Sequence, residues 1–148
     1  MPTIYTKEWY DSLKAILNRS EKVTKNAPRG RWKVLGEVRG DSTSPYLKSG
    51  DVKRFAVVLE DGRCTEYTEL DQSPPRQDFD FILELPATLF EGVVASHVDP
   101  IQAGLKGDIK ITGDIRMLIQ NAELVNVLAE IYASEAQTDW PQGQPPYA

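Results

Sequence analysis

The segment from Asp78 to Leu85 constrains the fold of this chain more than any other. Its sequence, DFDFILEL, places four apolar side chains on one face of an extended strand and three carboxylates on the other. A strand with one apolar face has to bury that face against other elements. We therefore predict a sheet that is covered on one face, with its carboxylates turned toward solvent.

Alternating apolar positions upstream predict three more strands, near residues 32–39, 55–60 and 64–70. The pair Asp61-Gly62 separates the last two of these strands. This pair tolerates the positive φ angles of a two-residue hairpin turn, so residues 64–70 are expected to pair back antiparallel. The small polar residues from Gly40 to Gly50 predict a surface loop and a candidate flexible rim.

Apolar residues at helical spacing predict a first helix from Thr6, its cap, to about Leu17. A second helix is expected to begin at Pro86, because proline suits a first helical turn. Its apolar stripe continues to Val98. Asp99-Pro100 is expected to end it, since the residue before a proline disfavours helical conformation.

A fifth strand is predicted between Gly104 and Gly113, where Leu105, Ile109 and Ile111 alternate with polar residues. A final helix follows, with Asp114 as its cap and an apolar stripe that extends to Tyr132. This order of elements fits an α+β fold, in which one mixed sheet carries helices mainly on one face.

The stretch from Asp78 to about Gln120 carries a specific series of residues. Phe90 lies within a predicted helix, Asp99-Pro100 ends it, Ala103 follows, and residues 107–114 read GDIKITGD. In this order the series resembles the sterol-carrier-protein-2 (SCP-2) family of lipid-transfer domains, as a prokaryotic-type, stand-alone member. The resemblance implies a five-stranded, mostly antiparallel mixed sheet with a hydrophobic tunnel under the helices. It implies a single domain over residues 1–133, and we expect residues 134–148, rich in Pro and Gln, to form a flexible tail.

The same resemblance implies binding or transfer of an apolar molecule such as a fatty acid, a sterol-like compound or an acyl lipid. The residues expected to line the cavity are Phe90, Val93, Val94, Leu105, Ile109, Ile111, Met117 and Leu118. Each of them also fits a filled core, so a core role stays open for every one. The alternative function is an interaction or dimerisation module of the same fold without an exchanging ligand. The sequence is compatible with an oligomer.

Catalytic and metal-binding patterns are not found in the sequence. His97 is the single histidine and is predicted to have a structural or helix-terminal role, because metal sites and general bases need partners at defined spacing. Cys64 is the single cysteine and is predicted to be a buried small hydrophobe. We therefore expect a non-enzymatic protein without a metal or a cofactor. A net charge of -5 argues against a nucleic-acid partner.

Basic residues gather around Trp32 in this otherwise acidic chain: Lys22, Lys25, Arg29, Arg31 and Lys33. They fit either a solvated loop or a patch that docks transiently on an anionic membrane. A cytoplasmic location is expected, because one cysteine suits a reducing compartment and Met1–Tyr5 lacks the pattern of a signal peptide.

Overall fold

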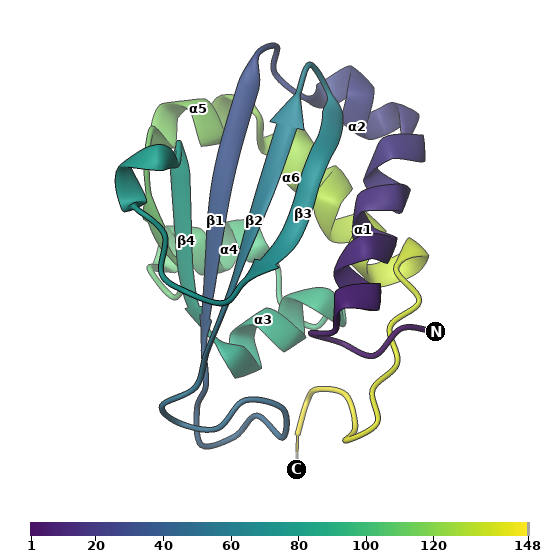
Figure 1. The fold of residues 1–148 in the computed structure, drawn as a ribbon, viewed down its shortest axis with the longest axis vertical. Coiled ribbons are helices and arrows are strands. Elements are labelled where there is room, and N and C mark those ends of the chain that lie inside the picture. The colour runs from purple at the N-terminus through teal and green to yellow at the C-terminus, as the bar shows by residue number, and fades with distance from the viewer. Residues whose placement is uncertain (148) are drawn as a thin grey trace.

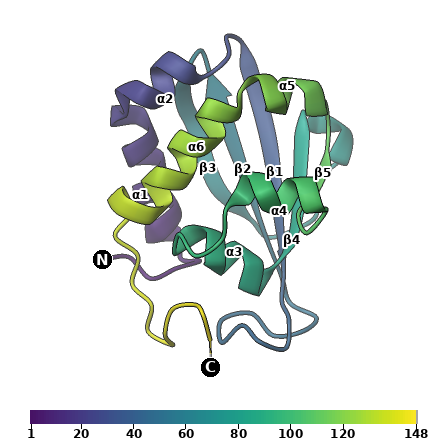
Figure 2. The same ribbon diagram turned by 180° about the vertical axis from the view of Figure 1, so that it is seen from behind.

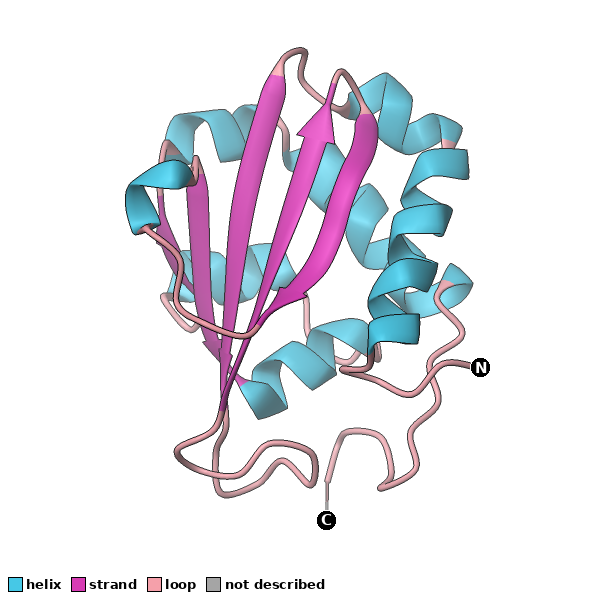
Figure 3. Ribbon diagram, in the orientation of Figure 1, coloured by secondary structure: helices cyan, strands magenta, loops and turns pink. Residues whose placement is uncertain are grey.

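The computed structural model describes residues 1–147, which form one sheet and the helices that cover it (Figures 1 and 3). The strands are β1 (Arg31–Arg39), β2 (Val52–Glu60), β3 (Arg63–Leu70), β4 (Phe81–Pro86) and β5 (Lys110–Thr112). The helices are α1 (Lys7–Arg19), α2 (Glu21–Asn26), α3 (Ala87–Val94), α4 (Pro100–Lys106), α5 (Ile115–Gln120) and α6 (Ala122–Glu130). A 3₁₀ turn, η1 (Arg76–Asp78), and a π-helical turn, η2 (Ile131–Glu135), complete the described elements.

The sheet has five strands in the order β3-β2-β1-β4-β5, with β1 at its centre. β1 pairs antiparallel with β2 and parallel with β4, and the outer pairs β2–β3 and β4–β5 are antiparallel. The predicted α+β fold with a mixed, mostly antiparallel sheet is therefore confirmed. The sheet is open, since β3 and β5 are its edges.

The helices α3, α4, α5 and α6 lie over one face of the sheet, and α1 packs along β3 (Figure 2). α1 begins at its predicted cap, where the Thr6 hydroxyl accepts a hydrogen bond from the backbone N–H of Trp9. Its apolar stripe is fully buried, with Trp9 and Leu13 at 0% exposure. No helix among residues 1–147 is both long enough and apolar enough to cross a bilayer.

The predicted hairpin turn is confirmed. Asp61 and Gly62 have φ angles of 50° and 86°, both in the left-handed region that a two-residue turn of this type requires. Asp61 also fixes the neighbouring end of the sheet, because its carboxylate accepts a hydrogen bond from the backbone N–H of Gly30.

The acidic face of β4 differs from the prediction. Asp78 belongs to η1 instead of the strand, and Glu84 is ion-paired. The Glu84 carboxylate, only 12% exposed, lies 3.1 Å from the Arg39 guanidinium and 3.7 Å from the Lys110 ammonium. Burial acts to raise the pKa of Glu84, but these cations outweigh it and lower the pKa.

The helix predicted from Pro86 to Val98 ends at Val94. The chain reverses at Ser96, whose φ of 61° is left-handed, and the backbone N–H groups of His97 and Val98 donate to the carbonyl of Gly92. The Val98 side chain then covers Gly92, at 2.7 Å from the position that a Cβ would take. His97 is exposed and lies in this turn, outside the helix that was predicted to extend over it.

The segment after Asp99-Pro100 is helical where a strand was predicted. Asp99 caps α4 with its carboxylate, and Pro100 is the first helical residue, a position where proline is favourable. Leu105 lies in this helix, and the strand β5 is confined to Lys110–Thr112. The alternation of apolar and polar residues that begins at Leu105 therefore does not correspond to a strand before Lys110.

The last helix begins after the predicted cap, because the Asp114 carboxylate accepts hydrogen bonds from the N–H groups of Arg116 and Met117. It is divided into α5 and α6 at Asn121, whose side chain donates to the Met117 carbonyl. The short helix α2, capped by the Ser20 hydroxyl, was not predicted.

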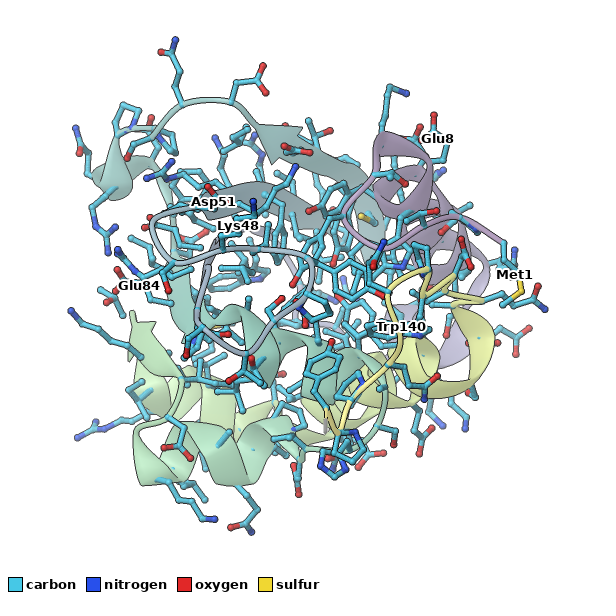
Figure 4. All side chains as sticks on the ribbon, turned by 90° about the horizontal axis from the view of Figure 1, so that it is seen from below. Met1, Glu8, Lys48, Asp51, Glu84 and Trp140 are labelled. Atoms are coloured by element: carbon cyan, nitrogen blue, oxygen red, sulfur yellow. The ribbon has the colours of Figure 1, made fainter. Side chains whose placement is uncertain are left out.

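The 40–51 loop and the C-terminal segment lie together at the lower end of the molecule, where Lys48, Asp51 and Trp140 are seen (Figure 4). The Trp140 ring meets the ring of Tyr46 edge-on, at 6.0 Å between centroids. The Trp9 indole N–H donates to the Thr138 hydroxyl at 2.9 Å. Residues 138–147 thus have defined contacts with the domain, while the boundary at residue 133 and the flexibility of the tail stay predictions. Ala148 lies outside the described residues.

Candidate ligand-binding pocket

An apolar pocket of about 260 Å³ lies between the sheet and the helices that cover it. Its floor is formed by alternate residues of three strands, because successive side chains of a strand point to opposite faces. These floor residues are Trp32, Val34 and Gly36 of β1, Phe55, Val57 and Leu59 of β2, and Phe81, Leu83 and Leu85 of β4. The strand β4 therefore supplies three of them.

Gly36 makes room for an aromatic ring in this floor. A Cβ at this position would stand 2.3 Å from the nearest ring carbon of Phe55. The absence of a side chain on Gly36 allows the Phe55 ring to lie over β1. The Phe55 ring also stacks on the ring of Tyr67 from β3, at 5.7 Å between centroids. The pocket thus has an aromatic wall on its β3 side.

The roof of the pocket comes from α1, α3, α4, α5, α6 and η2, and from the connections before β1, before β5 and between α5 and α6. It consists of Leu17, Pro28, Phe90, Val93, Pro100, Ile109, Met117, Leu118, Asn121, Leu124, Val125, Leu128, Ala129 and Tyr132. Four of these residues lie on α6 and recur at helical spacing. They belong to the last helix, whose apolar stripe was predicted to extend to Tyr132.

Five of the eight residues predicted to line a cavity are brought together here: Phe90, Val93, Ile109, Met117 and Leu118. Val94 is buried at 2% exposure but lies outside the pocket, because α3 turns it away from Val93. Leu105 is 71% exposed on α4. Ile111 is partly buried, with its Cδ1 atom 3.1 Å from the position of a Cβ on Gly104. Ligand binding by any of these residues stays a prediction.

The contribution of the sheet to this pocket was not predicted from the sequence. Val34, Val57 and Leu83 all had the alternating pattern of strand residues, and that pattern was used for the fold but not for the site. Tyr67 and Tyr132, which also line the pocket, lie far apart in the sequence and had no signal of their own.

Polar groups in the pocket are few and uncharged. No Lys, Arg, His, Asp or Glu of the part of the chain that the structure describes lines it. The amide of Asn121 is engaged with the Met117 carbonyl at 2.8 Å. The hydroxyl oxygens of Tyr67 and Tyr132 lie 2.5 Å apart. Burial raises the pKa of Tyr132 to about 12 and the pKa of Tyr67 well above its ordinary value, so both hydroxyl groups stay protonated.

A polar cleft of about 720 Å³ adjoins the apolar pocket on the outer side of α6. Its walls include His97, Asp99, Glu123 and Glu130, and it shares Val93, Pro100 and Ala129 with the pocket. Within residues 1–147, no three His, Cys, Asp or Glu side chains gather in a way that could hold a metal ion.

Cys64 lies apart from this cleft on β3, at 2% exposure. Burial raises the pKa of its thiol to about 11, so the thiol stays protonated at neutral pH. The nucleophilic thiolate form is therefore disfavoured at this position.

One carboxylate is fully buried near the pocket, on the residue that follows Phe90. Glu91, at 0% exposure, accepts hydrogen bonds from the hydroxyl groups of Tyr5 at 2.6 Å, Ser44 at 2.7 Å and Tyr147 at 2.5 Å. Burial, with the neighbouring carboxylate of Glu91, raises the pKa of Tyr5 and of Tyr147. At the lower end of the molecule, these hydrogen bonds thus join α3 to three segments that are distant in the sequence.

The basic residues around Trp32 lie at the opposite, upper end, on α2, at the start of β1 and in the connection between them (Figures 1 and 2). Lys22, Lys25, Arg29 and Arg31 are exposed there. The helix α5 occupies the same end and exposes Ile115 at 45% and Ile119 at 64%. Pro28 and Trp32, which line the pocket, lie within the basic segment.

Comparison with known proteins reveals one family. The model of the SCP-2 sterol transfer family matches residues 33–126. A crystal structure of sterol carrier protein 2 has a TM-score of 0.75 at 20% identity, with 88% of this chain and 98% of that chain covered. A conserved hypothetical protein of Thermus thermophilus, described as a possible sterol carrier protein, has a TM-score of 0.75 at 19% identity, with 97% and 96% covered.

A palmitated sterol carrier protein 2-like protein from Aedes aegypti is more distant, with a TM-score of 0.53 at 15% identity and 83% and 94% of the two chains covered. No curated protein matches the chain. At these identities the solved structures establish the fold, while the match of the family model covers more than half of the sequence.

Proposed function

The chain belongs to the SCP-2 sterol transfer family, and we propose that it binds an apolar, lipid-like molecule between the sheet and the helices. The observation that carries this proposal is the apolar pocket of about 260 Å³, whose lining includes no charged side chain within residues 1–147. The proposal assigns Phe90, Val93, Ile109, Met117 and Leu118 to ligand binding, together with the floor residues of the sheet.

An apolar space of this size favours an apolar occupant over water. A dry engineered cavity of about 150 Å³ is large enough to bind benzene, and water enters a cavity only where several polar partners hold it. The side chains that line an unfilled space also lack dispersion contacts on one side, and a hydrocarbon chain restores them. A single acyl chain therefore suits the pocket better than a charged metabolite.

The relatives support the same class of ligand. The Aedes aegypti protein is described as palmitated, so this fold accommodates a long acyl chain in that protein. We extend this property to the present chain by analogy of fold. Apolar walls discriminate weakly among hydrocarbons, so the proposal covers fatty acyl and sterol-like molecules alike.

We propose a carrier role without a catalytic step, in the cytoplasm. The thiol of Cys64 is buried and protonated, and the imidazole of His97 lies on the surface beside the polar cleft. Neither group is placed in the apolar pocket, where a bound lipid would lie. A single free cysteine suits a reducing compartment.

We further propose that the upper end of the molecule docks on an anionic membrane. This end combines the exposed basic residues of α2 and β1 with the exposed isoleucines of α5. Basic side chains are attracted to anionic lipid surfaces, and isoleucine side chains favour the interface between headgroups and acyl chains. The pocket residues Pro28, Trp32 and Met117 belong to the same end, so a lipid would enter directly from the membrane.

Native mass spectrometry of gently purified protein, followed by organic extraction, tests the proposed binding. A co-purified lipid, or added fatty acid that shifts the mass, is expected. The variant Leu83→Trp places an indole in the pocket floor and is expected to lose this binding, while Thr112→Trp, on the exposed edge strand β5, is the matched control and is expected to keep it. A wild-type mass that neither fatty acids nor sterols shift would overturn the proposal.

The alternative function is an interaction module without an exchanging ligand. The exposed side chains of Leu105, Ile115 and Ile119 favour it, because apolar groups on a surface often mark an interface. Sedimentation velocity distinguishes the two functions. A dimer that Ile115→Ser and Ile119→Ser dissociate, in a protein without bound lipid, would support the interaction module.

A further inference from the structure

The Tyr67 and Tyr132 hydroxyl groups form a polar pair within the apolar lining of the pocket. Tyr67 comes from β3 and is 1% exposed, and Tyr132 comes from η2. Their oxygen atoms lie 2.5 Å apart, so one hydroxyl donates its hydrogen to the other. Both residues line the pocket, so their side chains would lie beside an occupant.

One donor of this pair is left over. Two tyrosines bring two hydroxyl hydrogens, and the bond between them uses one. Within residues 1–147, neither hydroxyl has another hydrogen-bond partner. The nearby hydroxyl of Tyr10, whose ring stacks on Tyr67 at 6.0 Å, is buried and also lacks a partner there. Since buried polar groups are nearly always hydrogen-bonded, an unused O–H group beside a pocket points to an acceptor that the ligand supplies.

The pair suits a neutral acceptor. Burial raises the pKa of both tyrosines, which keeps them as O–H donors across the physiological range. No cation lines the described part of the pocket, so nothing there would neutralise a buried carboxylate or phosphate. The buried carboxylate of Glu91 shows how many donors such a group has elsewhere in this fold, since it accepts hydrogen bonds from three hydroxyl groups. The Tyr67–Tyr132 pair offers only one donor to a ligand.

We propose that the Tyr67–Tyr132 hydroxyl pair is the polar anchor of the pocket and selects a lipid with an uncharged hydroxyl or carbonyl oxygen. The hydrocarbon part of the lipid then lies along the floor formed by Val57, Val34 and Leu83. This inference rests on the proposed binding of a lipid, and it adds the end-group chemistry and the orientation of the ligand.

Matched twelve-carbon probes test the anchor, because 1-dodecanol, dodecane and dodecanoate differ only at one end. Displacement of a fluorescent fatty acid analogue measures their affinities at neutral pH. The wild-type protein is expected to prefer dodecanol over dodecane by roughly two- to tenfold, the effect of one neutral hydrogen bond. Dodecanoate is expected to bind more weakly than dodecanol, because its charge loses water without gaining a cation.

The double variant Tyr67→Phe/Tyr132→Phe removes both hydroxyl groups and is expected to lose the preference for dodecanol, binding it no more tightly than dodecane, because the alcohol hydroxyl then loses water without gaining a partner. Tyr46→Phe is the matched control, because it removes a hydroxyl that bonds to the Gly143 carbonyl outside the pocket, and it is expected to keep the preference. Equal binding of dodecanol and dodecane by the wild-type protein would overturn the anchor even if the double variant failed to fold. A double variant that kept the full preference would also overturn it, whereas a wild-type protein that binds no probe would overturn the proposed function itself.

Discussion

The carboxylate of Glu91 accepts a hydrogen bond from the hydroxyl of Tyr147, with the two oxygen atoms 2.5 Å apart. The same carboxylate is bonded by Tyr5 near the N-terminus and by Ser44 in the 40–51 loop. Helix α3 therefore connects three segments that are distant in the sequence. The Glu91 side chain, at 0% exposure, is hydrogen-bonded by hydroxyl groups alone among the described residues.

Replacing Glu91 with leucine is expected to lower the free energy of unfolding by about 2 to 4 kcal/mol, because it leaves buried hydroxyl donors without an acceptor. Glu91→Gln keeps one acceptor oxygen and is expected to lose less. Urea unfolding measures both changes. Glu135→Leu, at an exposed position, is the control and is expected to stay within about 0.5 kcal/mol of the wild type. A Glu91→Leu variant as stable as this control would contradict the assigned network.

Asp41 predicts a pH-dependent contribution to stability. Burial acts to raise the pKa of Asp41, but hydrogen bonds from Thr88, Ser44 and Thr43 outweigh it and lower the pKa. Since Pro86 provides no side-chain cap, the Asp41 carboxylate caps helix α3 from the loop, through the Thr88 N–H at 2.9 Å. A pKa that is lower in the folded state stabilises the fold above the unfolded pKa, and this contribution is lost as the pH falls through the folded value.

The variant Asp41→Asn is accordingly expected to be less stable than the wild type by about 1 kcal/mol at neutral pH, the usual effect of a lost cap. The difference is expected to shrink as the pH falls from the unfolded pKa of about 4 toward the lower folded pKa, where the wild-type carboxyl becomes protonated. Denaturant unfolding at a series of pH values measures it. Asp71→Asn, on an exposed turn, is the control, and a stability gap for Asp41→Asn that did not change with pH would exclude the carboxylate as its cause.

The tyrosines predict a delayed ionisation at high pH. Burial is the main cause that raises the pKa in all six: Tyr5, Tyr10, Tyr46, Tyr67, Tyr132 and Tyr147. A pKa that is higher in the folded state stabilises the fold below the unfolded pKa of about 10, and this stability is lost as the pH rises further. Tyrosinate absorbance is therefore expected to stay low at that pH and to appear together with unfolding.

The same chain in concentrated urea is the reference for this titration, because its tyrosines are exposed. Its absorbance is expected to rise around a pH of about 10. Coincident titration curves for the folded and the unfolded protein would show that the tyrosine hydroxyl groups ionise as if exposed to solvent. That result would contradict the burial of Tyr67 and Tyr132 on which the proposed anchor depends.

The upper end of the molecule predicts binding to anionic vesicles. Reversing Lys25, Arg29 and Arg31 to glutamate is expected to weaken binding to phosphatidylserine vesicles by about a hundredfold or more at low salt, since each basic residue contributes about 1 kcal/mol. Lys48→Glu, on the lower face, is the matched control and is expected to change little (Figure 4). Co-sedimentation measures the binding, and equally weak binding of the wild type to anionic and neutral vesicles would contradict the docking proposal.

Much of the fold could be predicted because local patterns and tertiary structure agree. The patterns that predict the strand β4, the Asp61-Gly62 turn and the caps Thr6 and Asp114 all act over a few residues, and each of these features was confirmed. The prediction for the segment from His97 to Ile109 was wrong, because the conformation of this segment depends on contacts that a local sequence pattern does not show. In the turn there, Val98 packs on Gly92, and Asp99 caps α4 instead of marking the end of the helix before it.

The pocket was predicted less completely than the fold. Helical spacing identified Phe90, Val93 and Leu118, but spacing does not show whether a buried face meets a filled core or a space. The Tyr67–Tyr132 pair depends on the crossing of β3 and η2, a relation that no local pattern reports. Such pairs follow from the topology of the whole chain.

The central strand β1 pairs with β2 and β4, which are separated from it by chain connections of different length. β2 follows it after one loop, whereas β4 lies parallel to it and arrives only after the β2–β3 hairpin and η1. Closing the longer connection costs more chain entropy, and non-local pairs form slowly. The antiparallel half is therefore expected to form before β4 and β5 join it. Since β4 supplies a third of the pocket floor, a partly folded chain is not expected to bind the proposed lipid, and lipid binding would then report a completed sheet.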